Sequence, residues 1–247
     1  MGPPALGETP LEHAAVLRTR TLVDNSRAGN VGTVTHAEAA DAPRGRRIRG
    51  LDADQRREQR RRQLLESALE LCAAHGYHNV SIEQLCQHAY VGTKSFYEIF
   101  PSREDCYIAL VGWISEQIMG EMTAHRAAAP PDAPDAERAL IAAFAHALVD
   151  DPRRALVTFG QASGVSPAVE RLRRANRRWA AEFVERFWRD AGTVGPDADV
   201  HRIAIGLVGG LFDLVADWLL TDDPAVDTLI DDLQAFYTAV RTGVATP

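Results

Sequence analysis

The sequence predicts an all-α protein, with a small N-terminal helix-turn-helix domain followed by a larger helical domain. Apolar residues recur at helical spacing through most of the chain, and capping side chains stand before these segments. No segment alternates with the period of two that half-buried strands show. The 247 residues are enough to bury a large core in one or two domains.

Three parts of different composition are expected. Residues 1–43 are rich in Ala, Gly, Pro and Thr without sustained periodicity, which is typical of a disordered leader. Residues 44–110 hold a basic arm and the helix-turn-helix, and residues 111–247 form an acidic helical remainder. Nine arginines and three acidic residues in 44–62 give +6, whereas 13 arginines and 22 acidic residues in 104–247 give −9. This uneven distribution of charge would orient the protein with its basic end toward the phosphate backbone of DNA.

The helix-turn-helix is predicted within residues 76–103. A first helix over about 53–74 ends at Gly76, because glycine adopts the left-handed conformation of a helix C-terminus without steric cost. Ser81 and Gln84 form a capping box that predicts the start of the second helix. The third helix turns aromatic side chains inward and ends at a proline, and such a helix is the one that enters the major groove of DNA.

The acidic remainder is expected to be helical throughout. An Asp-Pro or Ser-Pro pair at residues 151–152, 166–167 and 223–224 places a capping side chain before a proline at the first helical position. The expected helices span 103–128, 135–150, 152–162, 167–191, 199–221 and 225–243.

Composition and missing motifs exclude several classes of protein. Cys72, Cys86 and Cys106 have unrelated spacings, which indicates reduced core thiols and a cytoplasmic location. The N-terminus lacks the pattern of a secretion signal, and two aspartates interrupt the longest apolar stretch, 204–220. The common dinucleotide, phosphate-loop, zinc-protease and nucleophile-elbow motifs are absent, so we expect no enzyme, cofactor or metal site.

Residues 60–110 resemble the TetR family of bacterial transcriptional regulators. The matching positions are Ala68, Gly76, Tyr77, Val80, Ser81, Ile82, Ala89, Val91, Phe96, Tyr97, Phe100, Pro101, Ser102, Arg103 and Glu104. The resemblance implies a two-domain helical homodimer whose larger domain holds a small-molecule pocket. It also implies that a bound effector changes the separation of the two recognition helices.

Three positions depart from the pattern of that family. Tyr90 stands at the turn position that is usually glycine, where a left-handed backbone costs roughly 1 kcal/mol. Gly92 replaces the usual Ser or Thr cap of the recognition helix, and Ile99 stands where His is frequent. These departures concern the operator contacts rather than the fold.

The expected DNA contacts lie on the recognition helix and on the basic residues around it. Lys94 is the only lysine of the chain, and Tyr97 would donate its hydroxyl to a phosphate. For Ser81, helix capping explains the residue equally well, and a solvated tail is the alternative for the arginine arm. The expected DNA-binding residues are Arg47, Arg49, Ser81, Thr93, Lys94, Ser95, Tyr97 and Arg103.

The expected effector pocket lies among the helices that surround the ligand in similar proteins. An apolar or aromatic molecule fits such a lining, although a packed core explains the aromatic stripe as well. The expected pocket residues are Trp113, Ile118, Met122, Phe144, His146, Phe159, Trp179 and Phe183.

Helix 199–221 is apolar around nearly its whole circumference, which requires burial on all sides. With helix 225–243 it would form a four-helix interface between two subunits, and a central helix of a monomer is the alternative. The expected interface residues are Gly206, Gly209, Gly210, Phe212, Trp218, Leu233 and Phe236.

Together these expectations describe a DNA-binding protein rather than an enzyme. The expected function is a transcriptional repressor that binds a pseudo-palindromic operator as a homodimer and is released by a small lipophilic or aromatic effector. The alternative is a helix-turn-helix dimer without an effector, either regulated by a protein partner or acting constitutively. A general DNA-coating protein would instead bind all sequences equally, with salt as its only control.

Overall fold

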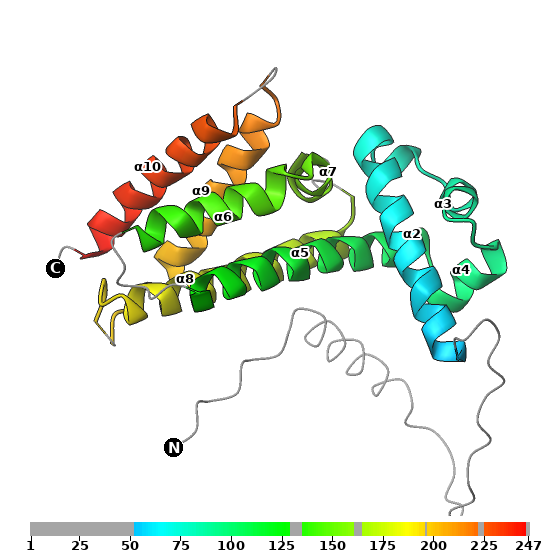
Figure 1. The fold of residues 1–247 in the computed structure, drawn as a ribbon, viewed down its shortest axis with the longest axis horizontal. Coiled ribbons are helices and arrows are strands. Elements are labelled where there is room, and N and C mark those ends of the chain that lie inside the picture. Colours follow the sequence, from blue (N-terminus) through cyan, green and yellow to red (C-terminus); the bar gives the residue numbers. More distant parts are fainter. Residues whose placement is uncertain (1–51, 129–134, 161–164, 196, 222–224, 246–247) are drawn as a thin grey trace, which may run out of the picture.

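The computed structural model describes residues 52–128, 135–160, 165–195, 197–221 and 225–245 (Figure 1). These residues form helices and turns without a β-strand among them, which confirms the all-α prediction. The elements are α2 (Ala53–His75), η1 (Tyr77–Asn79), α3 (Ile82–His88), α4 (Thr93–Ile99), α5 (Arg103–Ala128), α6 (Ala136–Val149), α7 (Pro152–Ala155), η2 (Leu156–Gly160), α8 (Pro167–Asp190), α9 (His201–Trp218) and α10 (Val226–Ala245). The predicted leader, 1–43, and the predicted arginine arm lie outside the described residues.

Helices α2, α3 and α4 pack together at one end of the molecule and form the head (Figure 1). Leu64 and Leu65 of α2 are fully buried against Leu85 of α3 and Phe96 of α4 within one continuous core. The side chain of Asp52 caps α2, and that of Ser81 caps α3, each in a capping box that satisfies free backbone N–H groups. Short helices α3 and α4 are therefore held by packing and caps rather than by their own length.

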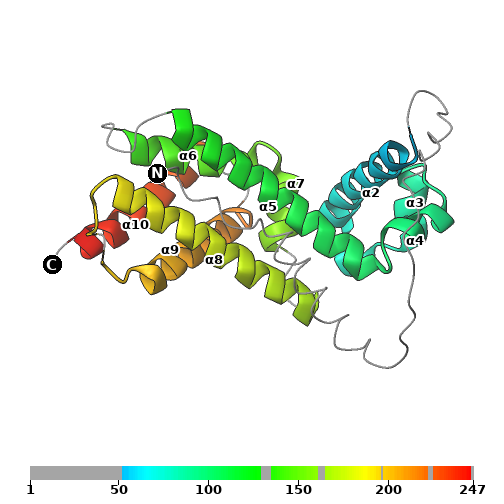
Figure 2. The same cartoon turned by 90° about the horizontal axis from the view of Figure 1, so that it is seen from below.

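Helix α5 leaves the head and runs along the larger helical body (Figures 1 and 2). Near its start, Cys106 and Tyr107 pack into the core of the head, whereas Ile118 and Met122 lie inside the body. The predicted division between residues 110 and 111 falls within this helix, so the two parts share a continuous element.

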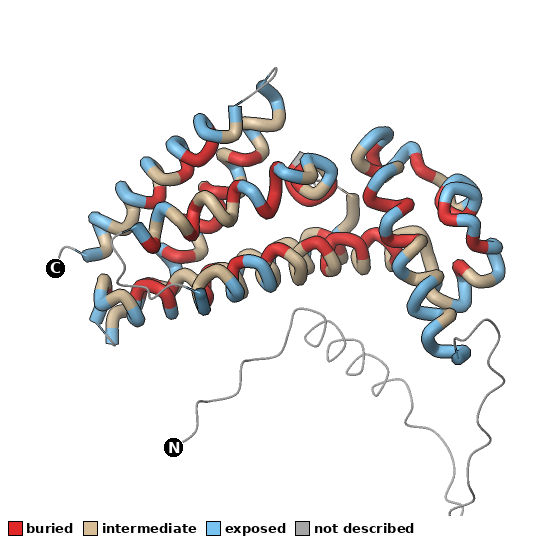
Figure 3. The backbone as a smooth tube through the Cα atoms, viewed as in Figure 1, coloured by how far each residue is buried: buried red, intermediate tan, exposed pale blue. Residues whose placement is uncertain are grey.

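Helices α6, α8, α9 and α10 complete the body, and their buried residues face one another (Figure 3). α9 packs against both α8 and α10, and α10 also packs against α6. The indole N–H of Trp188 donates to the hydroxyl of Tyr237 at 2.9 Å, which satisfies a buried donor between α8 and α10.

The predicted Asp-Pro and Ser-Pro helix starts are confirmed at two of three places. Asp151 accepts from the backbone of Arg153 at the start of α7, and Ser166 accepts from Val169 at the start of α8. The third, at 223–224, lies outside the described residues.

The prediction of one continuous α-helix over 152–162 is wrong, because the structure has two short segments of different helix type there. α7 makes one turn, and the chain then enters the π-helical segment η2, Leu156–Gly160. Two β-branched residues, Val157 and Thr158, and the terminal glycine weaken a regular α-helix at this point. π-Turns of this kind frequently occur at functional sites.

Candidate DNA-binding surface and internal cavity

Two buried phenylalanine side chains anchor the recognition helix α4 in the core of the head. Phe96 is fully buried, Phe100 is nearly so, and their ring centroids lie 5.8 Å apart. Arg57 of α2 also donates a hydrogen bond to the carbonyl oxygen of Glu98, at 3.1 Å. Helix α4 is therefore fixed to α2 through both its core side and its C-terminal end.

The turn before α4 carries the strain that the sequence indicated. Tyr90 has φ of 54°, in the left-handed region, and its side chain is 96% exposed. The next residue, Val91, is buried, and its backbone N–H donates to the carbonyl of Cys86 at 3.0 Å. Gly92 is the N-cap of α4 and supplies no capping side chain.

The outward face of α4 presents four of the predicted DNA contacts. Thr93 and Lys94 are exposed, Ser95 is half-buried, and Tyr97 is 54% exposed. The Tyr97 ring packs edge-on against Phe96 at 5.5 Å, which leaves its hydroxyl end toward solvent. Among the described residues, Lys94 has no carboxylate within ion-pair distance. The four side chains form a compact surface of hydroxyls and one ammonium group.

Two of the predicted DNA contacts also make hydrogen bonds within the protein. Arg103 donates to the carbonyl oxygen of Val80 at 2.6 Å and lies 4.5 Å from the ring centroid of Tyr77. This bond ties the start of α5 to the segment before α3 and uses one of the N–H groups of the guanidinium, so a phosphate contact by Arg103 stays a prediction. Ser81 serves the capping box of α3, accepting from the backbone N–H of Gln84 at 3.2 Å. The predicted contacts Arg47 and Arg49 lie outside the described residues.

An apolar cavity of about 110 Å³ lies in the body between α5, α6, α8 and α9. Its lining includes stacked and tilted aromatic rings: Phe212 lies 6.1 Å from Phe144 and 4.8 Å from Phe159. Six of the predicted pocket residues belong to this lining, namely Ile118, Met122, Phe144, Phe159, Trp179 and Phe183.

The other two predicted pocket residues lie elsewhere. Trp113 faces a separate space between the head and α7. His146 is exposed on α6, where its Nδ1 lies 2.9 Å from a carboxylate oxygen of Asp150. The prediction for both is corrected: the side of α5 that carries Trp113 faces the head and α7, and His146 lies outside the face of α6 that carries Leu140 and Phe144.

Polar residues of α8 were missed in the sequence. Arg173, Asn176 and Arg177 line the cavity together with Ser115 of α5 and Thr158 of η2. Their spacing provided a signal, since 173, 176, 177, 180 and 183 fall on one face of a helix that also carries aromatic residues. Charged residues on a helix normally lie in solvent, so this signal does not by itself indicate a cavity.

Several predicted interface residues are buried within the protomer. Leu233 is fully buried, Phe212 lines the cavity, and Gly210 faces the ring of Phe236 at a distance that excludes any side chain. Gly209 lies beneath the guanidinium of Arg177. The expectation is corrected for Leu233 and Gly209, because both are buried within one protomer. Gly210 and Phe212 are half-buried, and their part in an interface stays a prediction.

The remaining interface residues lie nearer the surface. Gly206 is exposed with open space around it, and Trp218 and Phe236 are half-buried. Ile203 of α9 is 44% exposed, and Leu220, in the turn after α9, is 84% exposed.

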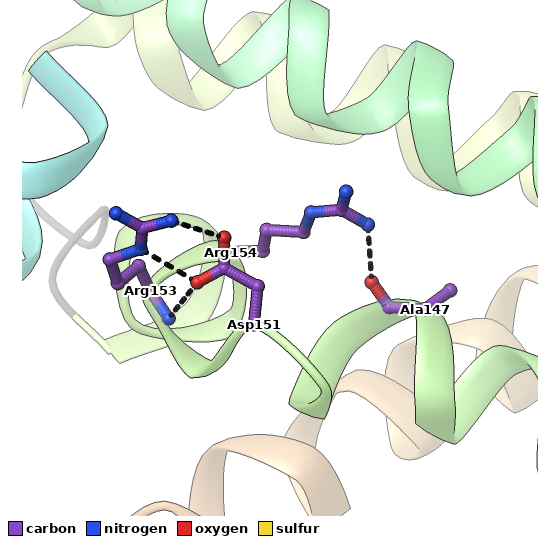
Figure 4. Close-up of polar contacts among 4 residues, drawn as sticks. All are labelled: Ala147, Asp151, Arg153 and Arg154. Carbon is purple, nitrogen blue, oxygen red and sulfur yellow. Dashed lines mark hydrogen bonds and ion pairs between the residues drawn. The ribbon is translucent and has the colours of Figure 1, made fainter. Parts of the chain in front are cut away.

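The space between the head and the body is polar, with a volume of about 530 Å³. Arg153 makes two hydrogen bonds to the carboxylate of Asp151, at 2.7 and 2.8 Å (Figure 4). Chiefly because of these bonds, the pKa of Asp151 is lowered. Arg154 donates to the carbonyl oxygen of Ala147 at 3.0 Å and pairs with Glu121 at 3.1 Å, so α7 is attached to both α6 and α5.

Segment η2 connects the cavity with the head. Thr158 and Phe159 line the cavity, whereas the carbonyl oxygen of Val157 accepts a hydrogen bond from the hydroxyl of Tyr107 at 2.9 Å. The Tyr107 ring in turn lies 4.8 Å from that of Tyr77, beside the helix-turn-helix. Burial raises the pKa of the Tyr107 phenol, so the hydroxyl remains a donor.

The three cysteines are free and buried. Burial raises the pKa of Cys72 to about 11 and that of Cys106 to about 12, which keeps both as unreactive thiols at neutral pH. Within the described ranges, no three His, Cys, Asp or Glu side chains gather as metal ligands. None of the described helices is long and apolar enough to cross a membrane.

Comparison with known proteins agrees with this geometry. Residues 64–110 match the sequence profile of "Bacterial regulatory proteins, tetR family". No curated protein sequence matches the chain.

Solved structures of low sequence identity share the fold. A proposed TetR-family transcriptional regulator from Syntrophomonas wolfei is 18% identical, with a TM-score of 0.66 over 76% of this chain and 97% of that one. The regulator FadR from Bacillus subtilis, solved with stearoyl-CoA, is 18% identical, with a TM-score of 0.57 over 75% and 97%. A TetR-like regulator from Rhodococcus sp. RHA1 is 18% identical, with a TM-score of 0.55 over 76% and 97%. The helix-turn-helix segment therefore matches the TetR profile, and the described residues have the fold of these regulators.

Proposed function

We propose that this chain is a transcriptional repressor of the bacterial cytoplasm that binds a pseudo-palindromic operator and leaves it when a small effector occupies the body. The observation that carries the proposal is the outward face of α4, where Thr93, Lys94 and Tyr97 project from a helix fixed by buried Phe96. Hydroxyls and an ammonium group are the donors that reach bases and phosphates in DNA grooves.

The operator is read by two copies of the chain. One α4 spans a single half-site, and a C2 dimer places two recognition helices in successive major grooves, about 34–36 Å apart. The outward sides of α9 and α10, with exposed Ile203 and uncovered Gly206, are the surface we assign to this dimer. Gly206 lets a partner helix approach closely, which supports an isologous four-helix contact.

The effector occupies the cavity in the body. FadR from Bacillus subtilis, which has the same fold, was solved with stearoyl-CoA, a ligand with a long apolar chain, and this supports an effector for the present chain. The cavity of about 110 Å³ favours an effector over the alternative of a regulator without one. Since η2 lines the cavity and contacts Tyr107, occupation of the cavity has a direct route to the head.

The test is a footprint of the full chain on DNA upstream of its own gene, together with operator affinity by fluorescence anisotropy. Lys94→Ala and Tyr97→Phe each weaken operator binding by about five-fold or more, which corresponds to the loss of about 1 kcal/mol or more for one hydrogen bond to DNA. Arg178→Ala, exposed on α8 of the body, is the matched control and leaves affinity unchanged. A chain that sediments as a monomer and prefers no sequence would refute the proposal.

A further inference from the structure

The cavity in the body is apolar, but three of the residues that line it also carry buried polar atoms. The Nε of Arg177, the Oδ1 of Asn176 and the Oγ1 of Thr158 are buried without a hydrogen-bond partner among the described residues. A buried polar atom without a hydrogen-bond partner destabilises the protein, so a ligand group that forms the missing bond binds more tightly by removing this cost. A purely apolar ligand would fill the space and leave all three atoms unpaired.

The charges around the cavity have one sign. Arg173 and Arg177 are its only charged lining residues within the described ranges. Arg173 lies 3.7 Å from Glu170, which also binds Arg174 at 2.7 Å. Arg177 has no carboxylate within 4.0 Å in the described part of the chain. A cationic ligand would be repelled here, whereas an anion would receive a charge-assisted hydrogen bond.

The position of Arg177 is fixed by its neighbours. Its guanidinium lies across Gly209 of α9, where a methyl group would be only 3.7 Å away, and 6.0 Å from the ring centroid of Phe212. At that distance a methyl group would make an ordinary van der Waals contact, so α9 and the Phe212 ring border the guanidinium closely. An extended arginine held in this way is ordered before a ligand arrives, which lowers the entropy cost of binding.

The amide of Asn176 is fixed in the same manner. Its Nδ2 donates to the hydroxyl of Ser115 at 2.7 Å, and that hydroxyl donates to the carbonyl of Val111 at 2.8 Å. This short chain of hydrogen bonds attaches the amide to α5 and leaves Oδ1 as an acceptor. Oδ1 suits a hydroxyl or N–H substituent close to the acidic group of a ligand.

We propose that the ligand is a compact apolar carboxylic acid, bound as its anion, with its carboxylate on Arg177 and its body among Phe144, Phe159 and Phe212. The proposal rests on the effector role proposed above. A cavity of roughly 150 Å³ accommodates benzene, so about 110 Å³ limits the body to a single ring or a short alkyl chain. Stacking on the phenyl rings favours an aromatic body.

Isothermal titration of the full chain at pH 7 tests this with three acid–amide pairs: benzoate and benzamide, phenylacetate and phenylacetamide, octanoate and octanamide. We expect each acid that binds to bind about ten-fold or more tightly than its amide, since the guanidinium bonds only the charged form strongly. Arg177→Met abolishes this preference, and Arg177→Lys keeps part of it. Arg178→Met, one residue along α8 and exposed, keeps it fully.

Equal affinity for acids and amides overturns the proposal, as does the absence of binding by all six compounds at millimolar concentration. An acid preference that persists in a folded Arg177→Met variant, checked by its melting curve, also overturns it. Operator affinity is measured in parallel without any compound. Failure of DNA binding there contradicts only the proposed function, whereas acid binding that leaves DNA affinity unchanged upholds the ligand class and refutes its role as effector.

Discussion

The hydrogen bond between Tyr107 and Val157 offers a measurable test of how α5 holds η2. Tyr107 is 2% exposed, Val157 is buried as well, and the hydroxyl lies 2.9 Å from the carbonyl oxygen. Tyr107→Phe keeps the ring that packs on Tyr77 and removes only the donor. A neutral hydrogen bond contributes about 1 kcal/mol, and a buried acceptor that loses its donor costs about 1–3 kcal/mol. We therefore expect the free energy of unfolding to fall by about 1–2 kcal/mol.

Urea unfolding followed by circular dichroism measures this change. The midpoint should move to lower urea with the slope unchanged, because the variant exposes the same surface on unfolding. Tyr97→Phe is the matched control: it removes the same hydroxyl from an exposed ring on α4. That control should leave the midpoint unchanged and weaken operator binding instead.

A Tyr107→Phe variant as stable as the parent protein would refute the reasoning. It would show that the ring packing alone holds η2 against α5. A change of slope in place of a shifted midpoint would also count against it, since it would indicate altered compactness rather than one lost bond.

Three further changes have defined outcomes. Tyr90→Gly should raise the free energy of unfolding by up to about 1 kcal/mol, since the left-handed turn at this exposed residue favours glycine; a lower melting temperature would contradict this. Ser81→Ala should cost about 1 kcal/mol by removing the cap of α3, whereas Ser81→Thr retains most of it in the same urea assay. Burial raises the pKa of Cys72 and Cys106 above the ordinary value of 9.0, so the folded protein holds these protons more tightly than the unfolded chain. The free energy of unfolding should therefore fall as the pH rises above about 9. A Cys72→Ala, Cys106→Ala protein should show a smaller fall between pH 8 and 10.

The head could be predicted from sequence because its signals are local. Ser81 and Gln84 are three residues apart, and the aromatic residues that fix α4 lie within the helix that they fix. The strain at Tyr90 was equally visible, since only the position of a bulky residue in a short turn was needed. The role of Arg103 was not visible, because its acceptor on Val80 is 23 residues away in the chain.

The body shows where sequence patterns do not determine contacts. An all-round apolar helix must be buried, but the pattern does not say whether a partner subunit or its own α8 and α10 cover it. Leu233 and Gly209 are buried within one protomer. Arg177 presents the opposite problem: a charge on an amphipathic helix normally indicates solvent, and only the fold shows that this arginine lies against Gly209 and Phe212 of another helix.

Segment η2 leads to a last prediction, about regulation rather than stability. Phe159 lines the cavity and Val157 bonds Tyr107, so the same turn contacts the ligand space and the head. If the effector acts through this turn, Tyr107→Phe should retain the affinity of each ligand measured alone and reduce the factor by which effector weakens operator binding. Coupling is reciprocal, so operator DNA should also weaken effector binding less in the variant. An unchanged factor in both titrations would exclude this bond as the route and leave the contacts of α7 with α2 to carry the effect.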